Sequence, residues 1–169
     1  MDRYKVNPSY KKRHVIPRYV WLTSGVGNYT NQKSAEFIAK KAAGIDELYY
    51  DDVSRIEKSP FILCTKDEFL AHAANNKIYK YGTQIFSTGA SAISACVSGI
   101  SMPDWGYVSY GAYRGSSVDR IKRSILKEMC YEYEADRQGI LPNPTQLVEH
   151  VQCADDREYC VLVAAMIIE

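Results

Sequence analysis

Residues 48–60, LYYDDVSRIEKSP, gather hydroxyl, carboxylate and guanidinium groups within a few positions. A serine hydroxyl can attack the carbonyl of the residue before it, which begins cleavage of the backbone by the protein itself. Ser54 offers such a hydroxyl, whereas Ser59, after Lys58, fits this chemistry less well. Arg55 has no oxygen or sulfur nucleophile. The stretch is therefore either a self-cleavage site or a segment that resembles one but lacks the reactive nucleophile.

The cysteine and histidine residues predict neither a disulfide framework nor a metal site. The five cysteines are an odd number and form no C-x-x-C pair, so we expect them to be small buried apolar groups. The three histidines are far apart in the sequence and show no metal-ligand spacing. The positions are Cys64, Cys96, Cys130, Cys153 and Cys160, and His14, His72 and His150.

Composition indicates a globular protein of one domain. Apolar residues make up 46% of the chain and charged residues 24%, with 21 Lys and Arg against 20 Asp and Glu. This balance argues against nucleic acid as a partner. The first forty residues contain no apolar run typical of a signal peptide, and no stretch approaches the roughly 20 apolar residues of a membrane span. We therefore expect a cytoplasmic protein that does not enter a membrane.

Hydrophobic periodicity predicts three helices set apart from runs of strands. The helices are expected at residues 34–43, ending at Gly44, at residues 65–75, starting from a Thr65 cap, and at residues 117–137. The expected strands are residues 18–24, 47–52, 61–64, 77–102 with turns at Gly82 and Gly89, 105–115, and a final hairpin of residues 145–153 and 158–168. The last strand is nearly all apolar, so we expect it to be buried on both faces.

Two glycines follow the first expected strand. Gly25 and Gly27, placed between a strand and a helix, resemble a phosphate-binding turn. The third glycine and the Lys-Ser/Thr ending of such turns are missing, so a plain turn is the better interpretation.

The order of elements predicts an α+β fold in which antiparallel sheet is covered by helices. Residues 1–15 hold two prolines and a basic cluster at 11–14, which indicates an irregular, solvated arm. Residues 16–169 are expected to form the single domain. The chain also has 14 tyrosines, which favour sheet packing over a tyrosine-lined ligand pocket.

Residues 16–168 resemble the pyruvoyl-dependent arginine decarboxylases in the order and spacing of their elements. The resemblance runs from IPRYVWLTSG through AGI at 43–45, GTQIFSTGASAISACVSGISMP and GYVSYGAYRG to LVEHVQCADDREYCVLVAAMII. It implies an αββα four-layer sandwich with mainly antiparallel sheets. It also implies a homotrimer or a pair of trimers forming a hexamer, with sites at the subunit interfaces.

The family cuts its own precursor within a Ser-Ser or Thr-Ser pair, and the second serine becomes a covalent pyruvoyl group that serves decarboxylation. Counted from residues 43–45, this pair falls on Ser54 and Arg55. Arginine cannot perform the acyl shift. A shift of one residue would make Ser54 the pyruvoyl precursor, with the cut after Val53.

The family also carries a proton-donating glutamate on the strand that matches residues 105–114. Tyr110 or Ala112 stands there, and this segment contains no Asp or Glu. A positioned general acid contributes about 10²- to 10⁴-fold, and a phenol with an ordinary pKa near 10 would need strong retuning to replace it.

The family's acidic residue for the arginine guanidinium corresponds to Phe37. Its neighbour Glu36 is turned by roughly 100° around the helix. Arginine is therefore a poor substrate prediction.

The first hypothesis is a relative that does not process itself and carries no cofactor. It binds a small molecule or a partner subunit in an interface pocket that suits a flat or anionic ligand, and the sequence leaves open whether that subunit is a catalytically intact paralogue. The expected pocket residues are Glu36, Tyr49, Asp52, Arg55, Tyr107 and Tyr110.

Two other hypotheses remain open. One is an active amino-acid decarboxylase with a pyruvoyl group at Ser54, assisted by Asp51 or Asp52 and with Tyr110 as proton donor. The other is an unrelated binding module whose basic arm contacts an acidic partner.

Overall fold

The computed structural model describes residues 14–115 and 117–169. These residues form mixed α and β structure, in agreement with the predicted α+β class. The helices are α1 (Gln32–Ala43), α2 (Lys66–Ala73) and α3 (Val118–Asp136); the strands are β1 (His14–Val15), β2 (Tyr19–Tyr29), β3 (Tyr50–Asp52), β4 (Arg55–Ile56), β5 (Ile62–Leu63), β6 (Ile78–Phe86), β7 (Ala92–Met102), β8 (Trp105–Arg114), β9 (Thr145–Gln152) and β10 (Glu158–Ile168).

The strands form two main sheets and a small ribbon. The larger sheet has the order β3-β6-β10-β2-β5, the second has the order β8-β7-β9, and β1 pairs with β4. All the long pairings, β10 with β2 and β6 and β7 with β8 and β9, are antiparallel. The pairings that involve the short strands β1, β3 and β5 are parallel.

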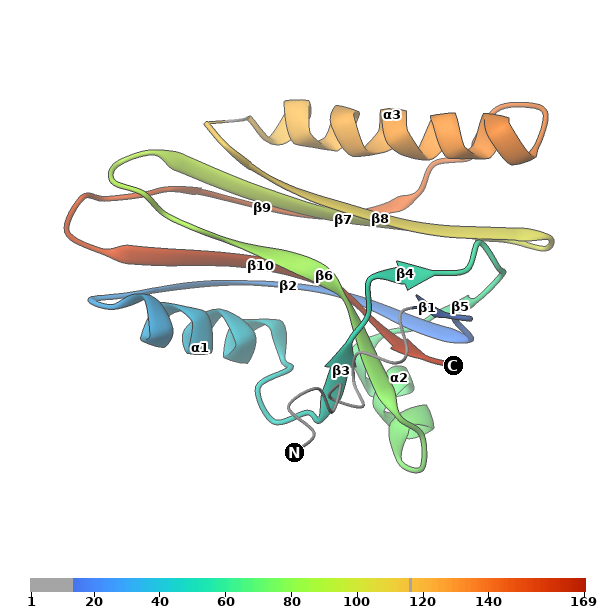
Figure 1. Ribbon diagram of the computed structural model, residues 1–169, viewed down its shortest axis with the longest axis horizontal. Helices are drawn as coiled ribbons and strands as arrows, with labels where there is room; N and C mark the ends of the chain where they lie inside the picture. The colour runs from blue at the N-terminus through green and yellow to red at the C-terminus, as the bar shows by residue number, and fades with distance from the viewer. Residues whose placement is uncertain (1–13, 116) are drawn as a thin grey trace, which may run out of the picture.

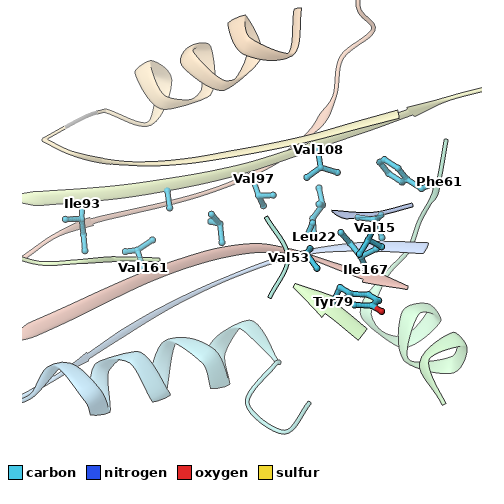
Figure 2. Packing of buried hydrophobic residues seen from close by; sticks show 14 of the residues in the cluster. Val15, Leu22, Val53, Phe61, Tyr79, Ile93, Val97, Val108, Val161 and Ile167 are labelled. Atoms are coloured by element: carbon cyan, nitrogen blue, oxygen red, sulfur yellow. The ribbon is translucent and has the colours of Figure 1, made fainter. Parts of the chain in front are cut away.

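The two sheets face each other, and helices lie on their outer sides (Figure 1). α3 covers the three-stranded sheet through Ile121, Ile125, Met129 and Tyr133, which are buried, whereas Val118 at its start is exposed. α1 and α2 cover the outer face of the five-stranded sheet. Between the sheets lies an apolar cluster that includes Ile93, Val97 and Val161 (Figure 2).

β10 is the central strand of the five-stranded sheet. Its side chains from Cys160 to Ile168 are buried, which confirms the prediction that both faces are covered. The predicted hairpin of the last two strands is wrong, because β9 pairs with β7 in the other sheet. Both edges of β10 are occupied by β2 and β6, so the turn at 154–157 carries the chain from one sheet to the other.

The predicted glycine turn at 25–27 is also absent. β2 continues through both glycines to Tyr29, and α1 packs against them. A Cβ at Gly27 would lie 2.0 Å from the carbonyl oxygen of Ala35, so these glycines are needed for the close approach of helix and strand. Gly82 likewise lies inside β6 instead of in a turn.

The predicted helix ends follow their capping signals. The Thr65 hydroxyl and the Glu68 carboxylate form a capping box at the start of α2. α1 ends at Gly44, whose φ of 77° is the left-handed conformation that glycine adopts readily. Ser117 caps the start of α3.

The N-terminal arm lies largely outside the described residues, because the basic residues 11–13 belong to that part. His14 and Val15, at the end of the predicted arm, form β1 beside β4, and Val15 is fully buried. Within the described part of the chain, no helix combines the length and the apolar character that crossing a membrane requires.

Candidate functional site

The stretch predicted to carry chemistry joins β3 to β4. β3 runs beside β6, and the N–H of Val53 then donates to the carbonyl oxygen of Lys80 at 3.0 Å. Val53 is buried, whereas Ser54 and Arg55 are exposed. Arg55 begins β4 in register with His14 of β1. The backbone around Ser54 is thus fixed on both sides by strand pairing.

The two aspartates of β3 are both paired with lysines of the neighbouring segment. Lys77 Nζ lies 2.6 Å from Asp51 Oδ2, and Lys80 Nζ lies 3.3 Å from Asp52 Oδ1. The Lys80 ammonium also lies 5.2 Å from the centre of the Tyr50 ring. These two ion pairs therefore hold β3 against β6 and against the residue before it.

A cavity of about 440 Å³ opens beside Arg55. Its lining consists of His14, Arg55, Ile56, Glu57, Lys58 and Asp136. His14 Nε2 lies 3.3 Å from Glu57 Oε1. Lys58 Nζ lies 2.5 Å from Glu132 Oε2 and 3.0 Å from Asp136 Oδ2. The cavity therefore joins the β1–β4 ribbon to the C-terminal end of α3.

Among the described residues that line this cavity, Lys58 is paired with carboxylates and Arg55 is not. Among the described residues, no carboxylate lies within ion-pair distance of its guanidinium, while His14 and Lys58 have acidic partners. A guanidinium presents a planar set of donors that matches a carboxylate or a phosphate. The arrangement can hold a small anion.

Lys58 and Asp136 hold each other in charged form. The hydrogen bond to Glu132 and then the one to Asp136 raise the pKa of Lys58 despite its partial burial. The Trp105 indole, which donates to Asp136 Oδ2 at 2.9 Å, and then Lys58 lower the pKa of Asp136. This network ties the segment after β4 to α3.

Tyr107 and Tyr110 lie on opposite faces of β8. The Tyr107 hydroxyl faces α3 and donates to Glu128 Oε1 at 3.3 Å, and Ser109 Oγ donates to Glu128 Oε2 at 2.7 Å. Tyr110 points between the sheets, where its ring packs edge-on against Tyr81 with centroids 4.8 Å apart. The two predicted tyrosines therefore do not line one pocket.

Both phenols are held in the protonated form. Burial, and after it the charge of Glu128, raises the pKa of Tyr107 and of Tyr110. A general acid works best with a pKa near the working pH, so the environment moves Tyr110 away from the predicted role of proton donor. The carboxylate that contacts β8 is Glu128, through Tyr107 and Ser109. It was not among the predicted site residues, because only acids within the strand itself were considered there.

Glu36 lies apart from the cavity beside Arg55, in a group of polar side chains between α1 and the β3–β6 edge of the five-stranded sheet. Its Oε1 lies 3.0 Å from Lys40 Nζ, and this hydrogen bond, more than the charge of Lys80, lowers the pKa of Glu36. The same partner raises the pKa of Lys40, with Tyr50 and Asp52 adding to the effect. Glu36 and Asp52 thus share a lysine-rich neighbourhood.

The remaining predicted residue, Tyr49, has a side chain 96% exposed. It lines a shallow hollow of about 310 Å³ together with Asp51 and Lys77. Phe37, which the resemblance matches to the family's acidic residue, is 57% exposed. The predicted site residues therefore occupy several places: Tyr49 and Asp51 line the hollow beside Lys77, and Arg55 lines the cavity beside Lys58 and Asp136.

Among residues 14–115 and 117–169, no group of three or more His, Cys, Asp or Glu side chains is arranged to hold a metal ion. No model of a known protein family matches this chain. No curated protein matches it either.

Proposed function

We propose that this chain is a cytoplasmic relative of the pyruvoyl-dependent arginine decarboxylases that does not process itself and binds a small anion at Arg55. The carrying observation is that the guanidinium at the expected nucleophile position lines a cavity and has no described acidic partner. The facing sheets with helices on both outer sides support the αββα four-layer assignment. The resemblance supports a homotrimer or hexamer.

The residues at the expected cleavage place do not fit a pyruvoyl group. Such a group is made from a serine or cysteine side chain, and Arg55 supplies neither oxygen nor sulfur. Ser54 would require the cut after the buried Val53, whose N–H is bonded to Lys80. No acidic residue occurs between residues 105 and 114 to return a proton to a product.

Anion binding at Arg55 is supported by the hydrogen bonds that the acidic side chains of the cavity already make. Asp136 accepts hydrogen bonds from Lys58 and from the Trp105 indole, so this carboxylate repels an incoming anion less than an unpaired one would. Arg55 can then donate two parallel hydrogen bonds to a carboxylate or phosphate.

The absence of processing is tested by intact mass and by a carbonyl-reactive hydrazide. We expect one chain of 19.2 kDa that takes up no hydrazide. Two fragments, with a ketone heading the larger one, would show that the active decarboxylase is the right hypothesis. Ser54→Ala serves as the control, because it must change nothing if Ser54 is not a precursor.

Anion binding is tested by calorimetry with succinate and with inorganic phosphate as probes. Arg55→Gln should weaken binding by about 10- to 100-fold, the range for losing a charge-assisted hydrogen bond. Arg123→Gln removes the same charge from α3 outside the cavity and should leave binding unchanged. Equal effects of the two variants would reduce the site to general electrostatic attraction.

A further inference from the structure

β8 forms the edge of the three-stranded sheet, and no described strand pairs with its outer side. The N–H of Gly115 donates to the carbonyl oxygen of Ala92 at 2.8 Å, which fixes the alternation along the strand. Odd-numbered residues of β8 therefore direct their backbone groups toward β7. Val108, Tyr110 and Ala112 direct their N–H and C=O groups outward. The edge offers a row of donors and acceptors to another strand.

The edge lacks the features that normally prevent strand addition. Its sequence, WGYVSYGAYR, contains no proline, lysine or acidic residue. The opposite edge of the same sheet, β9, carries Glu149, which accepts a hydrogen bond of 2.9 Å from Ser24 of β2. Glu149 lies inside β9, whereas the one charged residue of β8, Arg114, is its last residue and donates to the carbonyl oxygen of Phe86 in β6. β8 is the less protected edge of the two.

The charges along this edge are opposite at its two ends. Arg120, in the first turn of α3, lies beside Tyr113 near the C-terminal end of β8, while Arg114 at that end donates to the carbonyl oxygen of Phe86. Glu128 and Glu132 lie toward the other end, where they contact β8 and Lys58. A second copy in antiparallel orientation would place its basic end against the acidic end of the first. A parallel copy would oppose like charges.

The position of α3 leaves room for such a neighbour. α3 packs over the outer face of the three-stranded sheet (Figure 1), where its buried side chains meet Cys96 and Ile100 of β7 and Trp105 of β8. With strands about 4.8 Å apart, the two copies of α3 would lie roughly two strand spacings, about 10 Å, from each other. That is the usual distance of packed helices, about 8 to 10 Å.

We propose that β8 pairs antiparallel with β8 of a second copy across a two-fold axis. The two three-stranded sheets then form one continuous sheet, and the α3 helices pack side by side. Such an interface is self-complementary, because each copy supplies the same strand and the same charge pattern. The proposal does not depend on the anion site, which lies at the β1–β4 ribbon.

The first test is the mass of the full chain in solution by light scattering. We expect an even multiple of 19.2 kDa, a dimer or a hexamer. A monomer or an isolated trimer would overturn the proposal, because neither contains a two-fold axis.

The second test removes one outward hydrogen bond. Ala112→Pro deletes an outward N–H without touching the pairing with β7, and proline is tolerated at strand edges. It should halve the mass. The matched control is Gln146→Pro on β9, where the bond from Cys153 N–H to Ser91 shows that even-numbered residues face outward. An unchanged mass for a folded Ala112→Pro protein would overturn the proposal.

The third test keeps the wild-type chain, in case the proline variant fails to fold. Hydrogen exchange should show Val108, Tyr110 and Ala112 amides protected, although they lie at an edge, and the protection should fall on dilution. Fast exchange of these amides at high concentration would contradict the pairing. Arg120→Glu should raise the dissociation constant of the dimer about 2- to 5-fold. Lys122→Glu should leave it unchanged, because Lys122 lies near Gln146 on the β9 side of α3.

Discussion

Gly25 of β2 lies directly beneath Ala39 of α1, so that a side chain at position 25 would have no room. A Cβ placed there would lie 2.1 Å from the carbonyl oxygen of Ala39 and 2.7 Å from the backbone nitrogen of Ala43. Real Cβ atoms do not approach backbone so closely, so helix and strand would have to separate. The glycines that resemble a phosphate-binding turn instead allow a helix to rest on a sheet.

Gly25→Ala should therefore destabilise the protein strongly. We expect a loss of about 3 kcal/mol or more in the free energy of unfolding, the upper range for overpacking. Chemical denaturation measures it. Gly99→Ala is the matched control, because its nearest neighbour would be Leu22 Cδ1 at 3.4 Å, an ordinary contact. Equal stabilities of the two variants would contradict this account of α1 packing.

Local signals in the sequence predicted much of the fold. The Thr65 cap, Gly44 after the first helix and the helical periodicity of residues 117–137 act within a few residues, and the structure has a helix at each of these places. The errors concern distant partners. Whether β9 pairs with β10 or with β7 depends on residues far away in the sequence, and short-range patterns carry no information on that choice.

The site was harder to predict for the same reason. Strand alternation alone places Tyr107 and Tyr110, three residues apart, on opposite faces, so one pocket could not hold both. The contacts of Glu128 with Ser109 and of Glu132 with Lys58 arise where α3 packs across other segments. No spacing within the sequence reveals such contacts. Arg55 was singled out in the sequence because a guanidinium cannot act as the expected nucleophile, and its role in binding stays a prediction.

Lys58→Met should loosen the segment that follows β4. Lys58 joins this segment to Glu132 and Asp136, so amides of residues 57–60 should exchange faster in the variant. The pair is partly exposed and screened by solvent, so the global cost should stay at about 1 kcal/mol or less. Lys127→Met is the control, because Lys127 is an exposed lysine of α3, the helix that also carries Glu132 and Asp136. It should leave exchange at residues 57–60 unchanged.

The effect of Lys58→Met should depend on pH in a defined direction. The raised pKa of Lys58 means that its contribution is present below 10.5 and is lost at higher pH. The lowered pKa of Asp136 means that its contribution is present above 3.8 and is lost as the pH falls further. The difference between variant and wild type should thus be constant near neutrality and shrink at both extremes. A difference that grows in acid would contradict the network.

Thiol reactivity should separate one cysteine from the other four. Cys130 is partly exposed, whereas Cys64, Cys96, Cys153 and Cys160 are buried. Burial also raises the pKa of Cys96 to about 11 and that of Cys160 to about 12, which leaves little thiolate near neutrality. A chromogenic disulfide reagent should therefore find one fast thiol in the native protein and all five in denaturant. Cys130→Ser should abolish the fast phase, and Cys153→Ser should retain it.

Tyrosine ionisation should report the contact between the two sheets. Burial, and after it the neighbouring Tyr110, raises the pKa of Tyr81 to about 12. Because the folded protein holds this phenol in its protonated form, the free energy of unfolding should fall as the pH rises from about 10 toward 12. Absorbance titration of the native protein should show a late component. Tyr81→Phe should reduce that component and flatten the loss of stability, whereas Tyr49→Phe, which removes an exposed phenol, should leave it intact. A single ionisation step near pH 10 for all tyrosines would mean that water reaches Tyr81 between the sheets.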